Sequence, residues 1–389
     1  MKDQSSKPVY SIRQLLLYFL RLGTFGFGGP VALVGYMRRD LVDTKSWITD
    51  DDYKEGLALA QLAPGPLAAQ LAIYLGYVHY RILGATLAGI AFVLPSFSMV
   101  VALGWLYVHF GGLLWMQSVF YGVGACVIGI IAMSAYKLTN KTIGKDWLLR
   151  GIYVTAAALT IITKSENVFF FIGAGILVWM VKSPPKILMM RENLKSITFP
   201  LIGLMIVGTT IISDKLVNIF LFFGKAGTFV FGSGLAIVPF LYSGVVKEFG
   251  WLNEHQFIDA VAVAMITPGP VVITVGFIGY LVAGLPGACV AALATFLPCY
   301  VFTVVPAPYF KKYGKLPSIK AFVDGVTAAA IGAITGAVVI LGQKSLIDLP
   351  TIVIAIITVG LLLKYKKLQE PYIIIAAAIV GLFFRYFLR

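Results

Sequence analysis

The sequence predicts an all-α polytopic membrane protein with two inverted-topology repeats, whose Gly/Pro-broken helices re-enter and meet near the membrane midplane. The composition, one pattern that occurs twice, and breaks inside apolar segments predict this fold. Apolar residues fill 59% of the 389 positions and charged residues 12%, against about 45–50% and 25% in soluble domains. Mean hydropathy is +0.90. Apolar runs recur between short polar joints, which indicates one integral membrane unit without a separate soluble domain.

The N-terminal segment is polar and does not resemble a signal peptide. MKDQSSKPVYSIRQ lacks an apolar region and a small-residue cleavage site. We therefore expect no removable leader and a cytoplasmic N-terminus.

Composition also argues against metal sites, disulfides and nucleic acid as a partner. The cysteines form no CxxC pair and the histidines share no metal-ligand spacing, so we expect packing roles and no metal or cofactor. The net charge of +14 comes from basic residues in the joints, where membrane topology requires them. These cysteines and histidines are Cys126, Cys289, Cys299, His79, His109 and His255.

One unit occurs twice in the chain. We expect a first copy over 10–182 and a second over 216–388, separated at 183–215 by a cytoplasmic loop and a connecting transmembrane helix at 198–213. The paired positions are Gly23 and Gly227, Thr24 and Thr228, Phe25 and Phe229, Phe27 and Phe231, Gly28 and Gly232, Ala32 and Ala236, Val34 and Val238, Trp47 and Trp251, Pro64–Pro66 and Pro268–Pro270, and, after a one-residue slip, Gly76 and Gly279, Leu94 and Leu297, Pro95 and Pro298, Gly122 and Gly325, Ala125 and Ala328, and Gly129 and Gly332.

The charges of the joints predict that the second copy is inverted. Cytoplasmic joints are enriched in Lys and Arg, so the basic joints at 137–147 and 182–197 are expected inside. In the second copy the basic joints are 311–315 and 364–367, whereas 110–112, the counterpart of 311–315, has no charge. Equivalent joints therefore lie on opposite sides, and the connecting helix turns the second copy over.

The broken segments of the first copy can either span the membrane or dip in and return. With residues 1–12 and the joint HYR at 79–81 inside, loop 37–55 is outside in the first case and inside in the second. This loop has four basic residues, whereas its counterpart at 243–255 has only Lys247. The difference favours re-entry. Broken backbone at membrane depth must be buried in protein or line a wet cavity. The four basic residues are Arg38, Arg39, Lys45 and Lys54.

The breaks have the chemistry of an anion site. A proline after a glycine-rich bend suits the start of a helix, so Pro30 and Pro66 are expected to begin helices whose free amides and positive dipole ends attract anions. Glycine lets a ligand approach the backbone. The candidate substrate-binding residues are Thr24, Gly28, Gly29, Pro30, Gln61, Pro64, Gly65, Pro66 and Gln70 in the first copy, and Thr228, Gly232, Ser233, Gly234, Thr267, Pro268, Gly269 and Pro270 in the second, with Thr274 close by.

Two equivalent cations complete the candidate site. Arg21 and Lys225 each stand two residues before the shared Gly-Thr-Phe, and a charge inside a membrane segment is a functional candidate. The alternative is that they extend to the membrane interface. Glu55 and Asp259, also equivalent, could neutralise these cations or carry a proton, although a carboxylate that stabilises a helix start is favoured. We assign Asp324, which has no acidic counterpart, to a helix end.

With these residues, the chain resembles the chromate ion transporter (CHR) family over essentially its whole length. The resemblance lies in FGFGGPVALVGYMRRDLV, SWITDDDYKEGLALAQLAPGP, AIYLGY and FVLPS in the first copy, and in GTFVFGSGLAIVP and WLNEHQFIDAVAVAMITPGP in the second. It implies a bacterial or archaeal inner-membrane carrier that exports the chromate oxyanion. The family often has a histidine where this sequence has Leu33, which weakens any mechanism based on an imidazole there.

Three functions follow as hypotheses. The first is chromate export by alternating access, and so chromate resistance, with membrane lipid and a homodimer as expected partners. Moving one charge across 100 mV is worth about 2.3 kcal/mol, so exporting a dianion gains roughly 4.6 kcal/mol, or about three decades of gradient. The second is uptake or exchange of sulfate or another small oxyanion through the same fold, since helix ends and cations bind either dianion. The third, a membrane enzyme, lacks convergent catalytic groups.

Overall fold

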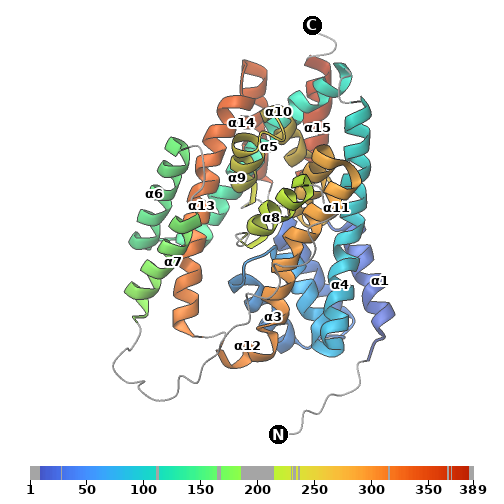
Figure 1. Ribbon diagram of the computed structural model, residues 1–389, viewed down its shortest axis with the longest axis vertical. Coiled ribbons are helices and arrows are strands. Elements are labelled where there is room, and N and C mark those ends of the chain that lie inside the picture. The colour runs from blue at the N-terminus through green and yellow to red at the C-terminus, as the bar shows by residue number, and fades with distance from the viewer. Residues whose placement is uncertain are drawn as a thin grey trace.

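The computed structural model is helical throughout the residues that it describes, with no strand among them. Those residues are 9–27, 29–110, 114–163, 168–184, 214–228, 230, 234, 237–313, 316–365, 368 and 370–384. The connecting helix expected at 198–213 lies outside them. The helices of Figure 1 are α1 (Ile12–Phe25), α2 (Gly29–Met37), α3 (Asp50–Leu62), α4 (Leu67–Phe110), α5 (Leu114–Leu138), α6 (Trp147–Thr163), α7 (Val168–Lys182), α8 (Asp214–Thr228), α9 (Ile237–Leu241), α10 (Glu254–Ile266), α11 (Thr274–Val304), α12 (Ala307–Tyr313), α13 (Pro317–Ser345), α14 (Leu349–Lys364) and α15 (Glu370–Leu382).

The two longest helices, α4 and α11, each contain a sharp reversal. The backbone leaves the helical region at Arg81 in α4 and at Ala283 and Gly284 in α11. Glycines pack across both reversals, because a Cβ on Gly76 would fall 2.3 Å from the carbonyl oxygen of Gly84, and a Cβ on its counterpart Gly279 would fall 2.4 Å from that of Gly287. Each element is therefore a helical hairpin, consistent with the joint expected at 79–81.

Three joints of the first copy lie together. The Tyr10 ring stacks on Trp47 at 4.9 Å between centroids, and its hydroxyl lies 2.8 Å from Nδ1 of His79. The Tyr80 hydroxyl in turn donates to the Tyr10 carbonyl. The chain before α1, the joint before α3 and the reversal of α4 thus form one aromatic cluster.

The two copies exchange helices. In the first copy α5 packs on α14 and α15 of the second, whereas α13 of the second copy packs on α6 and α7 of the first. Small residues allow both contacts: a Cβ on Gly122 would fall 2.0 Å from the carbonyl oxygen of Ala377, and one on the equivalent Gly325 would fall 2.4 Å from that of Ala174. The core of each copy is therefore completed by the other.

The centre of the molecule is formed by α1 packed on α4, α8 packed on α11, and α4 packed on α11. Helix starts around it are capped in equivalent ways. Thr49 caps α3 and Asn253 caps α10, each by accepting the amide of the third residue after it. These caps fix where α3 and α10 begin, and both helices end at a Pro-Gly-Pro bend.

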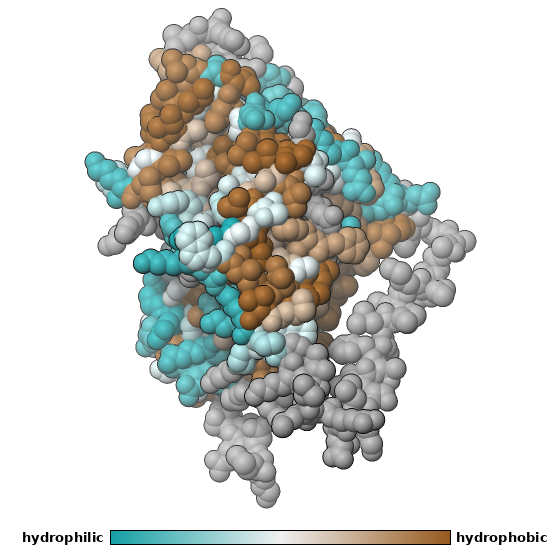
Figure 2. All heavy atoms as spheres, turned by 90° about the vertical axis from the view of Figure 1, so that its left-hand side faces the viewer, coloured by the Kyte–Doolittle hydropathy of each residue, from teal (hydrophilic) through white to brown (hydrophobic). Residues whose placement is uncertain are grey.

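The outer faces of the helices are apolar, as contact with lipid requires. Within the part of the chain that the structure describes, four helical stretches are long and apolar enough to cross a membrane, namely Leu67–Phe110, Gln117–Leu138, Val271–Phe310 and Pro317–Ser345, and four shorter apolar helices accompany them. On α6 and α7, Ile162 and Phe169 are 77% and 82% exposed. Figure 2 shows brown apolar side chains over much of the side that carries these helices, with hydrophilic ones gathered in separate areas. The chain is a multi-pass membrane protein.

Candidate functional site

The two Pro-Gly-Pro bends meet the Gly-rich breaks of the opposite copies. The amide of Gly65 donates to the carbonyl of Val230 at 2.5 Å, and the amide of Gly269 donates to the carbonyl of Gly26 at 3.0 Å. Gly65 and Gly269 are equivalent positions, as are Gly26 and Val230. Both glycines have positive φ, 144° and 95°, a backbone region that residues with a Cβ rarely adopt. The prolines on either side lack an amide, so the glycine amide is the donor that each bend can offer.

Each bend also packs on the residue that follows the Leu-Pro pair of the other copy. A Cβ on Gly269 would fall 2.0 Å from Oγ of Ser96, and one on Gly65 would fall 3.1 Å from Sγ of Cys299. Ser96 and Cys299 are fully buried. Sequence reasoning took Cys299 as packing and did not select Ser96. The repeated Leu-Pro pair was the signal that could have placed both beside the bends.

The threonines at and near the breaks donate to backbone carbonyls of their own helix or of the adjoining turn. Thr24 donates to Leu20 at 2.7 Å, and its counterpart Thr228 donates to Gly224 at 2.9 Å. Thr267 donates to Ala264 at 3.0 Å, and Thr274 to the carbonyl of Val271 at 2.8 Å. In this conformation these hydroxyl protons are directed to backbone carbonyls, so a ligand would have to displace those bonds.

Gln70 is the buried polar side chain of the first bend. It is 0% exposed, and its Nε2 donates to the carbonyl of Pro64 at 2.9 Å. Its Oε1 has no hydrogen-bond partner among the described residues, an uncommon and costly state for a buried polar atom. Gln61 is exposed. Gln70 therefore holds the bend closed and keeps one polar atom unsatisfied next to it.

The two cations lie on the outer faces of α1 and α8. Arg21 is exposed on the same stripe as Leu17 and Phe25, and Lys225 is exposed with its ammonium 6.0 Å from the centroid of Phe240. Among the described residues no carboxylate forms a salt bridge with either cation. Both stand about one turn before the breaks.

The structure describes only some of the remaining candidate residues at the breaks. Pro30 follows Gly29 in the first turn of α2, as expected. Gly234 is buried, and a Cβ there would fall 3.3 Å from that of Val271. The bend glycines are flanked by Pro64, Pro66, Pro268 and Pro270. Gly28, Gly232 and Ser233 lie outside the described residues.

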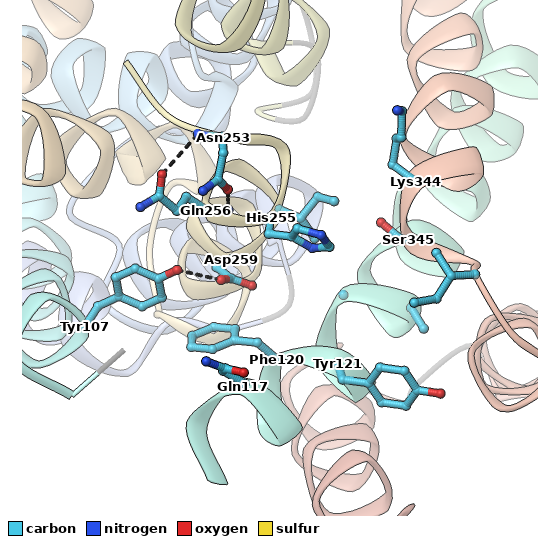
Figure 3. Close-up of a pocket in the computed structure, with 14 residues that line it drawn as sticks. Tyr107, Gln117, Phe120, Tyr121, Asn253, His255, Gln256, Asp259, Lys344 and Ser345 are labelled. Atoms are coloured by element: carbon cyan, nitrogen blue, oxygen red, sulfur yellow. Dashed lines mark hydrogen bonds between the residues drawn. The ribbon is translucent and has the colours of Figure 1, made fainter. Parts of the chain in front are cut away.

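The acidic pair lies on α3 and α10, and each carboxylate interacts with a tyrosine. Tyr74 interacts with Glu55, and the Tyr107 hydroxyl donates to Oδ2 of Asp259 at 2.7 Å. Asp259 lines a cavity of about 370 Å³ between α4, α5, α10 and α13 (Figure 3). Sequence reasoning did not identify Tyr107, because no motif marks it. Among the described residues no group of His, Cys, Asp and Glu could hold a metal ion.

Comparison with known proteins identifies the family. The profile described as Chromate transporter matches residues 13–179 and 217–382. The chain belongs to the chromate transporter family. It is 70% identical over 96% of its length to a Chromate transport protein of Cupriavidus metallidurans, of which the match covers 94%. It is 63% identical over 99% of both chains to a Probable chromate transport protein of Synechococcus elongatus.

A further relative matches less than half of the chain over nearly its own full length. The Uncharacterized transporter YwrA of Bacillus subtilis is 29% identical over 172 residues, 43% of this chain and 96% of its own. No solved structure matches the chain significantly. Leu33, the position at which the family resemblance led us to look for a histidine, is buried, and its side chain lies against Gly26. It fills the space beside the first break with an apolar group.

Proposed function

We propose that the protein exports the chromate dianion across the cytoplasmic membrane by alternating access, and thereby confers resistance to chromate. The observation that carries this proposal is the reciprocal pair of hydrogen bonds from Gly65 to Val230 and from Gly269 to Gly26. Each bond joins the bend of one copy to the break of the other. A rocking motion between the copies would break one bond and keep the other, and so open the centre to one side at a time.

The same contacts support inverted, re-entrant copies. Contacts that occur twice with the copies interchanged are those that a two-fold axis generates, and the exchange of α5 and α13 has this form. The cluster of Tyr10, Trp47 and Tyr80 brings the ends of both broken segment pairs of the first copy to one side. We infer that both pairs re-enter and turn back at the bends, with the N-terminus cytoplasmic.

The oxyanion site forms at the bends when they separate. Release of a bend frees a glycine amide, and the first-turn amides of the helix after Pro66 have no intrahelical acceptor. Thr24 and Thr228 can then turn their hydroxyls to the ligand. Arg21 and Lys225, exposed on the outer faces of α1 and α8 about one turn away, would turn inward to supply the positive charge. A tetrahedral dianion is bound by several such charge-assisted donors.

Membrane vesicles of both orientations test this function directly. We expect labelled chromate to accumulate in everted vesicles that contain the protein, and the Arg21→Ala and Lys225→Ala variants to reduce its rate about tenfold or more. Arg13→Ala, a change to a cation outside the breaks on the same helix, is the control and should keep the parent rate. Accumulation only in right-side-out vesicles would contradict export, and preferential transport of sulfate would favour the alternative substrate.

A further inference from the structure

The cavity beside α10 has a polar mouth and a carboxylate near its base. Lys344, His255 and Gln117 line it and are exposed, whereas Gly124 and Ala125 at its inner side are buried. Asp259 lies between them and is partly buried. In Figure 3 the Tyr107 side chain points at Asp259 from one side, while His255 and Lys344 lie toward the other. The volume of about 370 Å³ accommodates a small oxyanion with water.

Asp259 has an unusual set of neighbours for a carboxylate in such a place. Its recorded hydrogen bond comes from a neutral hydroxyl, that of Tyr107. The cation in the lining, Lys344, pairs instead with Glu254 at 3.2 Å, and Lys247 pairs with the same carboxylate at 3.0 Å. No salt bridge to Asp259 occurs among the described residues. A half-buried carboxylate without a cation is costly in its charged form.

The elements around Asp259 bring few other titratable groups. The cavity is lined by Tyr107 of α4, Tyr121 of α5 and Lys344 of α13. The Tyr121 hydroxyl donates to Asp348 at 2.6 Å. On α10 itself His255 lines the cavity. Helix α11 contributes Phe277, which carries no titratable group and whose ring centroid lies 5.6 Å from that of Tyr107. The charged and titratable groups around the cavity are therefore Asp259, the Lys344–Glu254 pair and His255.

A dianion in this cavity would be repelled by an ionised Asp259. Two like charges that share a site repel each other, so a bound dianion favours the protonated form of Asp259. Because linkage is reciprocal, an anion that raises the affinity of Asp259 for a proton is itself bound more tightly when that proton is present. Loss of the proton then drives the anion out.

We infer that this cavity is the exit site of the transported oxyanion, and that Asp259 binds a proton when the anion enters it and expels the anion when that proton leaves. The inference rests on the proposed function. The proton comes from, and returns to, the water at the end of the protein where α10 begins, so the net transport of two negative charges is unchanged. Asp259 precedes Thr267 by about two turns of helix, so α10 connects the cavity to the second bend.

Titration calorimetry of chromate binding to the purified full-length protein tests the inference. The titration is done in two buffers of different protonation enthalpy, both alkaline enough to keep chromate a dianion, so that proton uptake by the protein is measured separately from binding. We expect the parent to take up a proton with the bound chromate. Asp259→Asn should still bind chromate with no uptake, whereas Glu248→Gln, which alters an exposed acid outside the cavity, should match the parent.

Tyr107→Phe provides a second test that preserves the shape of the cavity. Removing the hydroxyl that stabilises the ionised carboxylate should move the pH dependence of proton uptake upward by about one pH unit. Equal uptake by parent and Asp259→Asn, or no uptake by a parent that binds chromate, would overturn the inference and leave the proposed function intact. A folded parent that binds no chromate would overturn the proposed function itself.

Discussion

Gly65 and Gly269 are each constrained in backbone angle, in hydrogen bonding and in packing. Each has a positive φ, donates its amide to the opposite copy, and leaves no room for a Cβ. A substitution there therefore tests backbone strain and close packing together, whereas a glycine with positive φ on an open surface tests strain alone.

Gly269→Ala should lower the stability and transport of the protein. The new Cβ would fall 2.0 Å from Oγ of Ser96, and overpacking of this kind costs about 1–3 kcal/mol in addition to the cost of positive φ. Gly250→Ala is the matched control, because Gly250 has φ 59° and nothing within 4 Å of its Cβ position. Apparent melting temperature in detergent gives the comparison. Adding Ser96→Ala to Gly269→Ala should restore part of the loss, and equal melting temperatures for the two glycine variants would contradict the packing.

Some of these residues were predictable from sequence and others were not. The repeat identified Gly65 and Gly269, because a glycine between two prolines indicates a bend with unusual backbone angles. This pattern can be recognised in the sequence alone. It could not reveal that their amides bond to the opposite copy, or that Thr24 and Thr228 donate to their own helices, because both facts depend on tertiary contacts. Tyr107 belongs to a helix far from Asp259 in sequence, so its hydrogen bond was equally invisible.

At the scale of elements, the exchange of α5 and α13 depends on glycine. Gly122→Leu and Gly325→Leu should each destabilise the protein by about 1–3 kcal/mol or more, because a Cβ alone would already strike backbone of the partner helix. Gly173→Leu, in α7 at a position with nothing within 4 Å, should leave stability near that of the parent. The recovery of monodisperse protein by size-exclusion chromatography provides the measurement. Normal recovery of both α5 and α13 variants would argue against the exchange.

An ion pair at the joint after α5 should make stability depend on pH. Asp146 accepts the amides of Leu148 and Leu149 and pairs with Lys182 at the end of α7. The Lys182 hydrogen bond lowers the pKa of the Asp146 carboxyl, so its stabilisation is present above the unfolded pKa of about 3.9 and is lost as the pH falls through the folded pKa. Asp146→Asn keeps the cap and should cost about 0.5–1 kcal/mol at neutral pH.

This difference should disappear in acid. Thermal unfolding of parent and Asp146→Asn is compared at neutral pH and at an acidic pH well below the unfolded carboxyl pKa of about 3.9, where the lowered folded pKa of Asp146 has also been passed. Asp43→Asn, at an exposed acid that forms no salt bridge with any described residue, controls for the general effect of removing a negative charge. A gap that stays constant over this range would contradict the ion pair.

Element types were more predictable than their partners. The apolar runs predict helices, and the Leu-Pro pairs lie inside α4 and α11. The sequence did not predict that α5 packs on α14 and α15, because small residues show only that a close helix contact exists. The packing of the whole chain decides which helix makes that contact.

At the scale of the molecule, each copy is completed by the other. A chain cut between residues 213 and 214 should therefore function only when both pieces are made together. We expect the two pieces to copurify through a tag on one of them and to restore transport, and either piece alone to be recovered poorly, since its α5 or α13 lacks its partners. Stable recovery of one piece alone, without the other, would contradict this expectation.

We propose that an oxyanion dianion passes through the centre where the bends of both copies meet. Chromate distribution in proteoliposomes under an imposed membrane potential tests it most directly, with Gly269→Ala and Gly250→Ala beside the parent. The parent should distribute chromate as a carrier of two charges, about three decades at 100 mV, Gly250→Ala should match it, and folded Gly269→Ala should be slowed at least tenfold. A distribution that ignores the potential, or parent-like flux through Gly269→Ala, would contradict the account.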